Sequence, residues 1–215
     1  INETYRGLFA GGLGTESSPY LIATAEQFAN IGELADEMSR NVAIHFRLTA
    51  DIDLATITQP ASSEISSCFH GTLDGNGYSI TSGEQSVWLS VEAVFGTTVK
   101  DLTIVQRGGE KNGRFTLFAF AGWCDPVAGS RGTYTFENVT VEGISADTVV
   151  SVDTNESAFI QQTNSNTTVN FINCLNSVNI NTESYAGIFL GGYAGYSNVT
   201  YENCVNTATV TGVTV

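Results

Sequence analysis

Four short stretches of this chain align without gaps: Val99-Lys-Asp-Leu-Thr-Ile104, Phe136-Glu-Asn-Val-Thr-Val141, Phe171-Ile-Asn-Cys-Leu175 and Tyr201-Glu-Asn-Cys-Val205. Each stretch begins with an apolar residue, carries Asp or Asn two places later, and continues with an apolar residue or Cys. The aligned asparagines recur every 30 to 35 residues, at positions 138, 173 and 203. Self-similarity with such a period indicates a repeat architecture.

Between these stretches the sequence favours strands over helices. From residue 45 to the end, short runs of apolar and polar residues alternate, with turn residues between them. Stacked coils of two or three strands can bury a continuous core without helices, each coil advancing about 4.8 Å. The sequence therefore predicts an all-β solenoid. The recurring Asp101, Asn138, Asn173 and Asn203 are expected to stack as a ladder, with amide side chains bonding to the coils above and below.

One segment near the N-terminus is typical of a helix. Thr24-Ala-Glu-Gln27 is a capping-box pattern, and apolar residues follow at spacings of three and four up to Met38. We expect an N-terminal cap over residues 1–44, with an α-helix at about 25–38, and one continuous domain of coils over residues 45–215.

The C-terminal strand pattern ends without a cap. Residues 206–215 alternate like a strand, and an uncovered strand edge invites pairing with another chain. We expect this edge to be covered, either because the chain continues into further coils beyond residue 215 or because a second copy docks head to tail. The chain begins at Ile1 without a signal-peptide pattern, which predicts a processed or excised product.

Composition narrows the possible partners. The net charge is −14, from 22 acidic and 8 basic residues, so the chain repels nucleic-acid backbones. No run approaches the roughly 18 apolar residues of a spanning helix, so no membrane span is expected in this sequence. Sequons at five asparagines make the chain a candidate extracellular or cell-surface glycoprotein; they begin at Asn2, Asn138, Asn155, Asn166 and Asn198. A glycan on Asn138 would conflict with an internal ladder.

The four cysteines favour an oxidising compartment over a zinc site, because they form no Cys-x-x-Cys pair. Cys174 and Cys204 align at one repeat position and are expected on adjacent coils. They could form a disulfide or stand as two stacked free thiols. Pairing of Cys68 with Cys124 follows only by elimination.

The N-terminal half is similar to a known protein pattern. The run Phe9-Ala-Gly-Gly-Leu-Gly-Thr-Glu-Ser-Ser-Pro-Tyr-Leu-Ile-Ala-Thr-Ala-Glu-Gln-Phe28, followed by Ala50–Leu54 and Phe69–Ile80, resembles secreted and cell-surface microbial proteins with GLUG-type repeats. The resemblance implies a right-handed β-helix on a secreted or cell-surface protein, so we expect a right-handed parallel β-helix in which the helix at about 25–38 is the one N-terminal capping α-helix. It also implies a role that in such proteins is often adhesive or unknown, and it implies no catalytic residues.

Acidic groups near the start of the coils allow two chemical hypotheses. Asp51, Asp53, Asp74 and Asn76 could hold calcium, or a pair of the carboxylates could cleave a polysaccharide. Asp74-Gly-Asn-Gly77 is also a turn sequence, because its glycines permit positive φ and Asp caps its own backbone. We therefore expect no catalytic residue, and no metal or cofactor other than calcium as a possible ligand.

The sequence thus predicts a non-enzymatic structural or adhesive β-solenoid glycoprotein, acting as a surface adhesin or a filament subunit. Its partner would be a glycan or a protein on a surface, or another copy of itself. The alternative is a carbohydrate-active β-helix enzyme, a polysaccharide hydrolase or lyase.

Overall fold

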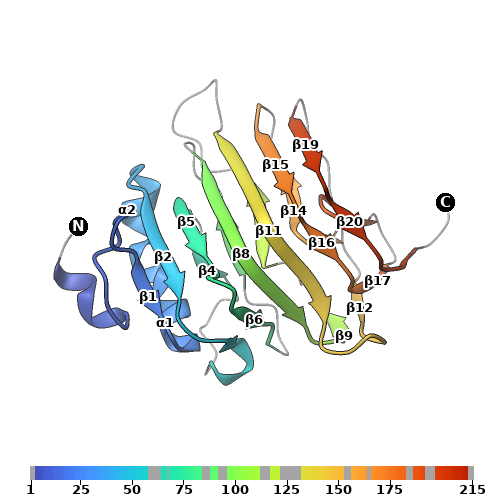
Figure 1. The fold of residues 1–215 in the computed structure, drawn as a ribbon, viewed down its shortest axis with the longest axis horizontal. Coiled ribbons are helices and arrows are strands. Elements are labelled where there is room, and N and C mark those ends of the chain that lie inside the picture. The colour runs from blue at the N-terminus through green and yellow to red at the C-terminus, as the bar shows by residue number, and fades with distance from the viewer. Residues whose placement is uncertain are drawn as a thin grey trace.

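The structure is a computed structural model that describes residues 3–57, 64–66, 68–83, 88–91, 96–111, 117–121, 132–152, 156–163, 166–182, 186–191 and 197–212. Its fold is mostly β, with long parallel sheets and one segment of α-helix near the N-terminus (Figure 1). No helix in these ranges is long and apolar enough to cross a membrane.

The helical segment consists of three consecutive pieces, α1 (Ala25–Ala29), the 3₁₀ turn η2 (Asn30–Leu34) and α2 (Ala35–Ser39), rather than the single α-helix expected at 25–38. Thr24 caps α1 by accepting a hydrogen bond from the Gln27 amide at 3.2 Å, and the Gln27 side chain accepts one from the Ala23 amide at 2.7 Å. A Cβ on Gly32 would lie 2.2 Å from the Ile65 carbonyl oxygen. Glycine therefore allows η2 to approach the strand that contains Ile65.

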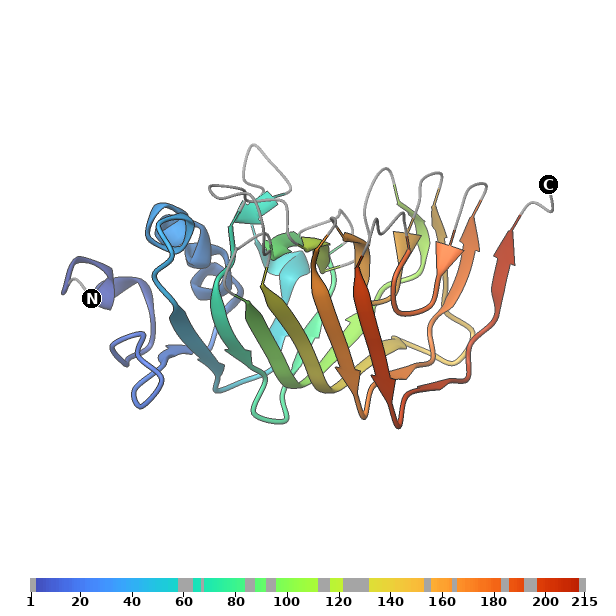
Figure 2. The ribbon, with the colours of Figure 1, turned by 90° about the horizontal axis from the view of Figure 1, so that it is seen from above.

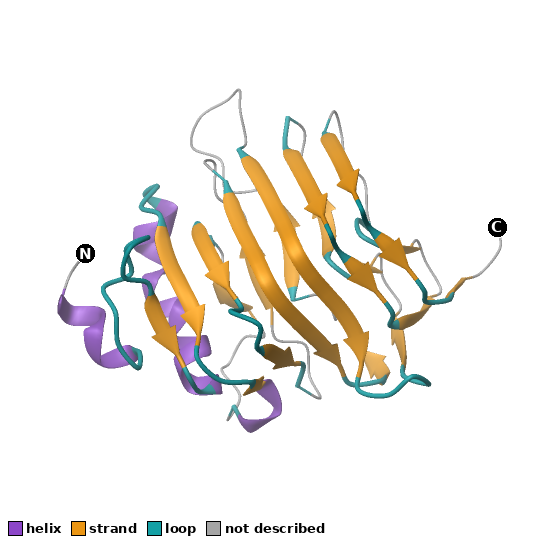
Figure 3. Ribbon diagram, viewed as in Figure 1, coloured by secondary structure: helices purple, strands orange, loops and turns teal. Residues whose placement is uncertain are grey.

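The other short helices are η1 (Glu3–Leu8) and η3 (Leu54–Thr56). The largest sheet contains eleven strands, and its long path runs from the helical end to the C-terminal end of the molecule (Figures 1 and 3). In order, this path is β1 (Tyr20–Ile22), β2 (Ile44–Leu48), β5 (Gly71–Asp74), β8 (Thr97–Gln106), β11 (Thr133–Gly143), β15 (Thr168–Ile172) and β19 (Asn198–Glu202). The shorter strands of the same sheet are β3 (Ile52–Asp53), β6 (Ser79–Thr81), β16 (Leu175–Asn176) and β20 (Val205–Asn206).

Three smaller sheets complete the molecule. One contains β4 (Glu64–Ser66), β7 (Trp88–Val91), β10 (Phe118–Ala121) and β14 (Ile160–Thr163); the second contains β9 (Gly109–Lys111), β12 (Val149–Val152), β17 (Asn179–Thr182) and β21 (Val210–Gly212); the third pairs β13 (Glu156–Ser157) with β18 (Ala186–Gly187). These strands pair in parallel, as the strands of the largest sheet do. From β8 to β15 the chain passes repeatedly from the largest sheet to the β12 sheet, then to the β10 sheet, and back (Figure 2).

The register of the largest sheet agrees with the gap-free sequence alignment. Val99 is paired with Phe136, Phe136 with Phe171, and Phe171 with Tyr201. Val99, Phe136 and Phe171 of this row are buried, and Tyr201 is exposed at its end; the ring centroids of Phe136 and Phe171 are 5.4 Å apart and those of Phe171 and Tyr201 5.3 Å. Burial of this row and its neighbours supplies the hydrophobic stabilisation of the fold.

Candidate functional site

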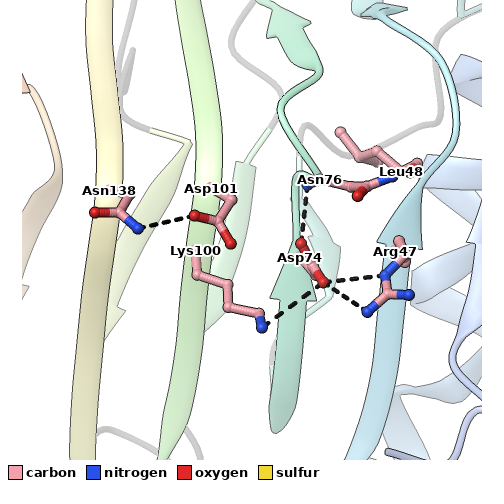
Figure 4. A network of polar contacts seen from close by, with 7 residues as sticks. All are labelled: Arg47, Leu48, Asp74, Asn76, Lys100, Asp101 and Asn138. Carbon is pink, nitrogen blue, oxygen red and sulfur yellow. Dashed lines mark hydrogen bonds and ion pairs between the residues drawn. The ribbon is translucent and has the colours of Figure 1, made fainter. Parts of the chain in front are cut away.

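The predicted ladder residues lie side by side on the largest sheet. The Asn138 Nδ2 donates to Asp101 Oδ1 at 2.9 Å, as Figure 4 shows. The Asn173 Nδ2 donates to Asn138 Oδ1 at 3.1 Å, and the Asn203 Nδ2 donates to Asn173 Oδ1 at 3.2 Å. The structure thus joins all four residues in one chain of hydrogen bonds, in which each amide donates to the ladder residue that precedes it in the sequence.

The backbone explains why these positions carry Asp and Asn. The φ angles of Asp101, Asn138, Asn173 and Asn203 are 50, 54, 53 and 53°. Asn and Asp tolerate this left-handed region better than other residues with a Cβ. The side chains of Asn138, Asn173 and Asn203 are exposed, so the expectation of an internal ladder is corrected: the ladder lies on the outer surface.

A second, internal amide pair was missed in the sequence. Asn176 is fully buried, and its Nδ2 donates to Asn206 Oδ1 at 2.9 Å on the paired strand β20. Its Oδ1 also accepts a hydrogen bond from the Val178 amide, which satisfies a turn that the strands leave open. The sequence signal was present, because Asn-Ser-Val at 176–178 and Asn-Thr-Ala at 206–208 are 30 residues apart.

Beside the exposed ladder lies a row of alternating charges. Arg47 is paired in register with Asp74, Asp74 with Lys100, and Lys100 with Glu137. The Arg47 Nε and Nη2 both lie 3.0 Å from Asp74 Oδ2, and the Lys100 Nζ lies 3.8 Å from the same oxygen (Figure 4). Because Asp74 is only 6% exposed, these cations offset the cost of burying its carboxylate.

The structure does not bring the four calcium candidates together. Asp74 accepts the Asn76 amide at 2.9 Å in its own turn, and the Asn76 Nδ2 reaches the Leu48 carbonyl at 3.4 Å. Asp51 accepts both the amide and the hydroxyl of Ser79, at 2.8 and 3.0 Å. Within the described ranges no group of three or more His, Cys, Asp or Glu side chains could hold a metal ion.

Asp53, the remaining candidate, is held by a cation. The Arg107 Nη2 lies 2.6 Å from Asp53 Oδ2, and the Ala55 amide donates to Asp53 Oδ1 at 3.0 Å. Desolvation raises the pKa of Asp53, but the hydrogen bonds from Ala55 and Arg107 outweigh it and leave this pKa below its ordinary value. A catalytic acid needs the opposite shift, so Asp53 is poorly suited to that role.

The outer face of the largest sheet carries a second registered row, made of uncharged groups. Thr72 pairs with Thr98, Thr98 with Thr135, Thr135 with Asn170, and Asn170 with Thr200. At the C-terminal end, the Thr200 hydroxyl donates to Asn170 Oδ1 at 2.7 Å. The hydroxyls of Thr98 and Thr135 bond to no other described side chain or backbone group, so they are available to a ligand.

The cysteines divide into two kinds. Cys174 and Cys204 are both free thiols, so the disulfide predicted as one alternative does not form and the stacked thiols are present instead. Burial raises the pKa of Cys174 to about 12. Cys68 is disulfide-bonded. Its predicted partner, Cys124, lies outside the described residues, so that pairing stays a prediction.

The sequons also differ in their surroundings. Asn2 and Asn155 lie outside the described residues. Asn138 is exposed but engages its side-chain amide in the ladder, whereas Asn166 lies in an exposed turn with φ 61° and Asn198 is exposed at the start of β19. The two latter sites are the more accessible to a modifying enzyme.

No model of a known protein family matches the chain. The chain is 34% identical over 87 residues to the "Putative Gly-rich membrane protein" of Evansella cellulosilytica, an alignment that covers 38% of this chain and 10% of that protein. It thus spans about a tenth of the relative's length. It is also similar to the crystal structure of "a putative immunoglobulin A1 protease from Bacteroides ovatus", with 15% identity and a TM-score of 0.45 over 97% of this chain and 82% of that one.

Proposed function

We propose that this chain is a non-catalytic module of an extracellular or cell-surface protein, folded as a right-handed parallel β-helix, with an adhesive role. Its repeated passage through the same sheets, with parallel strands in register, supports a solenoid. Connections between parallel strands of one sheet are right-handed in about 98% of cases. The helical segment at Ala25–Ser39 would then cap the N-terminal coil.

The observation that carries the adhesive role is the registered row of Thr72, Thr98, Thr135, Asn170 and Thr200. Paired strands lie about 4.8 Å apart, so the row offers regularly spaced hydroxyl and amide groups on one face of a sheet. Such groups can both donate and accept hydrogen bonds, as the hydroxyls of a sugar chain require. A surface glycan is therefore the partner that this row fits best.

The extracellular location rests on three separate features. Disulfides persist in oxidising compartments, and Cys68 is disulfide-bonded. Asn166 and Asn198 are exposed sequons. The net charge of −14 favours solubility at a cell surface and repels nucleic acid.

Binding of the labelled chain to intact cells and to a glycan array would test this proposal. A variant with Thr98→Val and Thr135→Val removes two hydroxyls from the row while keeping the side-chain shape. The matched control is Thr103→Val with Thr211→Val, which changes two strand threonines outside the row. We expect the first variant to lose binding and the control to retain it.

The target surface can be treated to identify the partner. Periodate oxidation of the surface sugars should abolish binding, whereas protease treatment should not. If protease treatment abolishes binding and periodate oxidation does not, the partner is a surface protein rather than a glycan. Equal binding by both variants, or measurable cleavage of a polysaccharide by the purified chain, would contradict the proposal.

A further inference from the structure

The uncharged row on the outer face of the largest sheet has a second row beside it. The first row contains Thr72, Thr98, Thr135, Asn170 and Thr200. Two residues earlier on β11, β15 and β19 lie Thr133, Thr168 and Asn198, which are also paired in register. Residues i and i+2 of a strand point to the same side of a sheet, so both rows face outward. Figure 1 shows these strands side by side.

The side chains of these two rows, which together form the polar band, keep most of their hydrogen-bonding capacity. The Thr200 hydroxyl donates to Asn170 Oδ1 at 2.7 Å. The Asn170 Nδ2 and the hydroxyls of Thr133 and Thr168 bond to no other described group. The two rows are about 6.6 Å apart along the strands, and the members of each row are about 4.8 Å apart across them. The band is therefore a grid of donors and acceptors that is wide enough for one sugar ring.

The charges beside the polar band favour an uncharged ligand. Two residues after the first row, the paired strands carry Asp74, Lys100, Glu137, Ile172 and Glu202. Asp74 is held by Arg47 and Lys100, whereas Glu137 and Glu202 form no ion pair with a described residue. These two carboxylates and the net charge of −14 would repel an acidic glycan. The band itself contains only hydroxyl and amide groups.

We propose that the polar band binds a neutral, β-1,4-linked polysaccharide that lies across the strands, with one sugar on each strand. This inference rests on the proposed function and specifies its ligand. When both links of a pyranose ring are equatorial, the chain is extended, and each sugar advances by close to the spacing of paired strands, about 4.8 Å. Successive sugars then meet successive strands from β5 to β19.

The linkage of the sugar chain decides whether it can follow the band. Alternate sugars of an extended β-1,4 chain are turned over, and hydroxyl and amide groups suit both orientations because they donate and accept hydrogen bonds. An axial link, as in an α-1,4 chain, makes the sugar chain curve away from a straight row after one or two sugars. The α-1,4 chain therefore gains few contacts when it is made longer.

The test measures the binding of oligosaccharides of two to six sugars by calorimetric titration. Glucose oligomers with β-1,4 links and with α-1,4 links differ only in linkage, and β-1,4-linked N-acetylglucosamine oligomers identify the sugar that fits better. The chain is produced without N-linked glycans, because Asn198 begins a sequon within the band. We expect the affinity for a β-1,4 series to rise up to five sugars, by about ten-fold or more from two sugars to five. The affinity for the α-1,4 series should not rise.

Three variants test where the sugars lie. Thr133→Val, in the second row, should weaken binding of the five-sugar β-1,4 oligomer. The matched control is Thr140→Val, on the same strand and face but outside the band, and it should bind as the wild type does. Thr72→Val should weaken binding of the five-sugar oligomer and leave that of the three-sugar oligomer unchanged, because three sugars fit on β11, β15 and β19. Equal unfolding temperatures of the variants would show that the fold is retained.

Equal affinity for the two linkages, or an affinity that does not rise with length, would overturn this inference. Tighter binding of a polyuronate than of the neutral oligomers would also overturn it. These results differ from a failure of the adhesive role. A chain that binds another glycan through Thr98 and Thr135 keeps the proposed function and loses this ligand, whereas a chain that binds no cell surface and no glycan loses both.

Discussion

Replacing Asn173 with Ala should destabilise the protein by about 2–4 kcal/mol. Asn173 makes two ladder hydrogen bonds, at 3.1 and 3.2 Å, and each exposed bond contributes about 0.5–1 kcal/mol. Its φ of 53° adds a cost of about 1–2 kcal/mol for Ala, which has a Cβ and no side-chain hydrogen bond. Asn173→Gly should fall between the wild type and Asn173→Ala, because glycine adopts this φ without strain.

The stability losses of two ladder variants, at Asn203 and at Asn173, can be compared. Asn203 has the same φ of 53° but makes one ladder bond, so Asn203→Ala should cost about 0.5–1 kcal/mol less than Asn173→Ala. Urea unfolding followed by circular dichroism would measure both losses. Asn198→Ala, an exposed strand position outside the ladder, is the control and should change stability by less than about 0.5 kcal/mol. Equal losses for Asn173→Ala and Asn198→Ala would refute the structural role of the ladder.

Three further outcomes are expected. Phe136→Ala should cost about 3–5 kcal/mol in urea unfolding, because the side chain is 1% exposed and contacts three aromatic rings; a loss under 1 kcal/mol would contradict the packing. Burial lowers the pKa of His70, although the hydrogen bond of its ring with the Gly96 carbonyl opposes this shift. The unfolded chain therefore takes up the proton more readily, so the melting temperature should fall as the pH drops below about 6.5. His70→Gln should weaken that dependence. In the folded chain at about pH 8, iodoacetamide should modify Cys204 before Cys174, whose thiol pKa is raised by burial to about 12; equal rates by mass spectrometry would contradict this.

The repeat pattern predicted the register because alignment and pairing follow the same physical rule. Residues in register on neighbouring strands point to the same side of the sheet, so Phe136, Phe171 and Tyr201 align in the sequence and stack in the structure. The ladder could be predicted for a similar reason, since a left-handed backbone position selects Asn or Asp.

The outward orientation of the ladder side chains could not be predicted from the alternation of inward and outward residues along a strand. Val99 points inward, and strict alternation would place Asp101 inward as well. The left-handed backbone at Asp101 interrupts the period, so Lys100 and Asp101 both face outward and Leu102 returns to the core. The ion pair of Arg107 with Asp53 was also hidden, because the two residues are 54 positions apart in the sequence. The partners of the other calcium candidates were hidden in the same way, because Asp51 and Ser79 are 28 residues apart and Asp74 and Arg47 are 27 residues apart.

The ladder also determines where the chain can vary in length. Its residues are separated by 37, 35 and 30 positions, yet they remain in contact. The differences in length are therefore absorbed by the chain between the ladder strands, and the ladder edge keeps a constant alignment. Insertions and deletions acquired during evolution would accumulate away from this edge without shifting the strands beside it. One side of the molecule can thus diversify while the other side preserves its spacing.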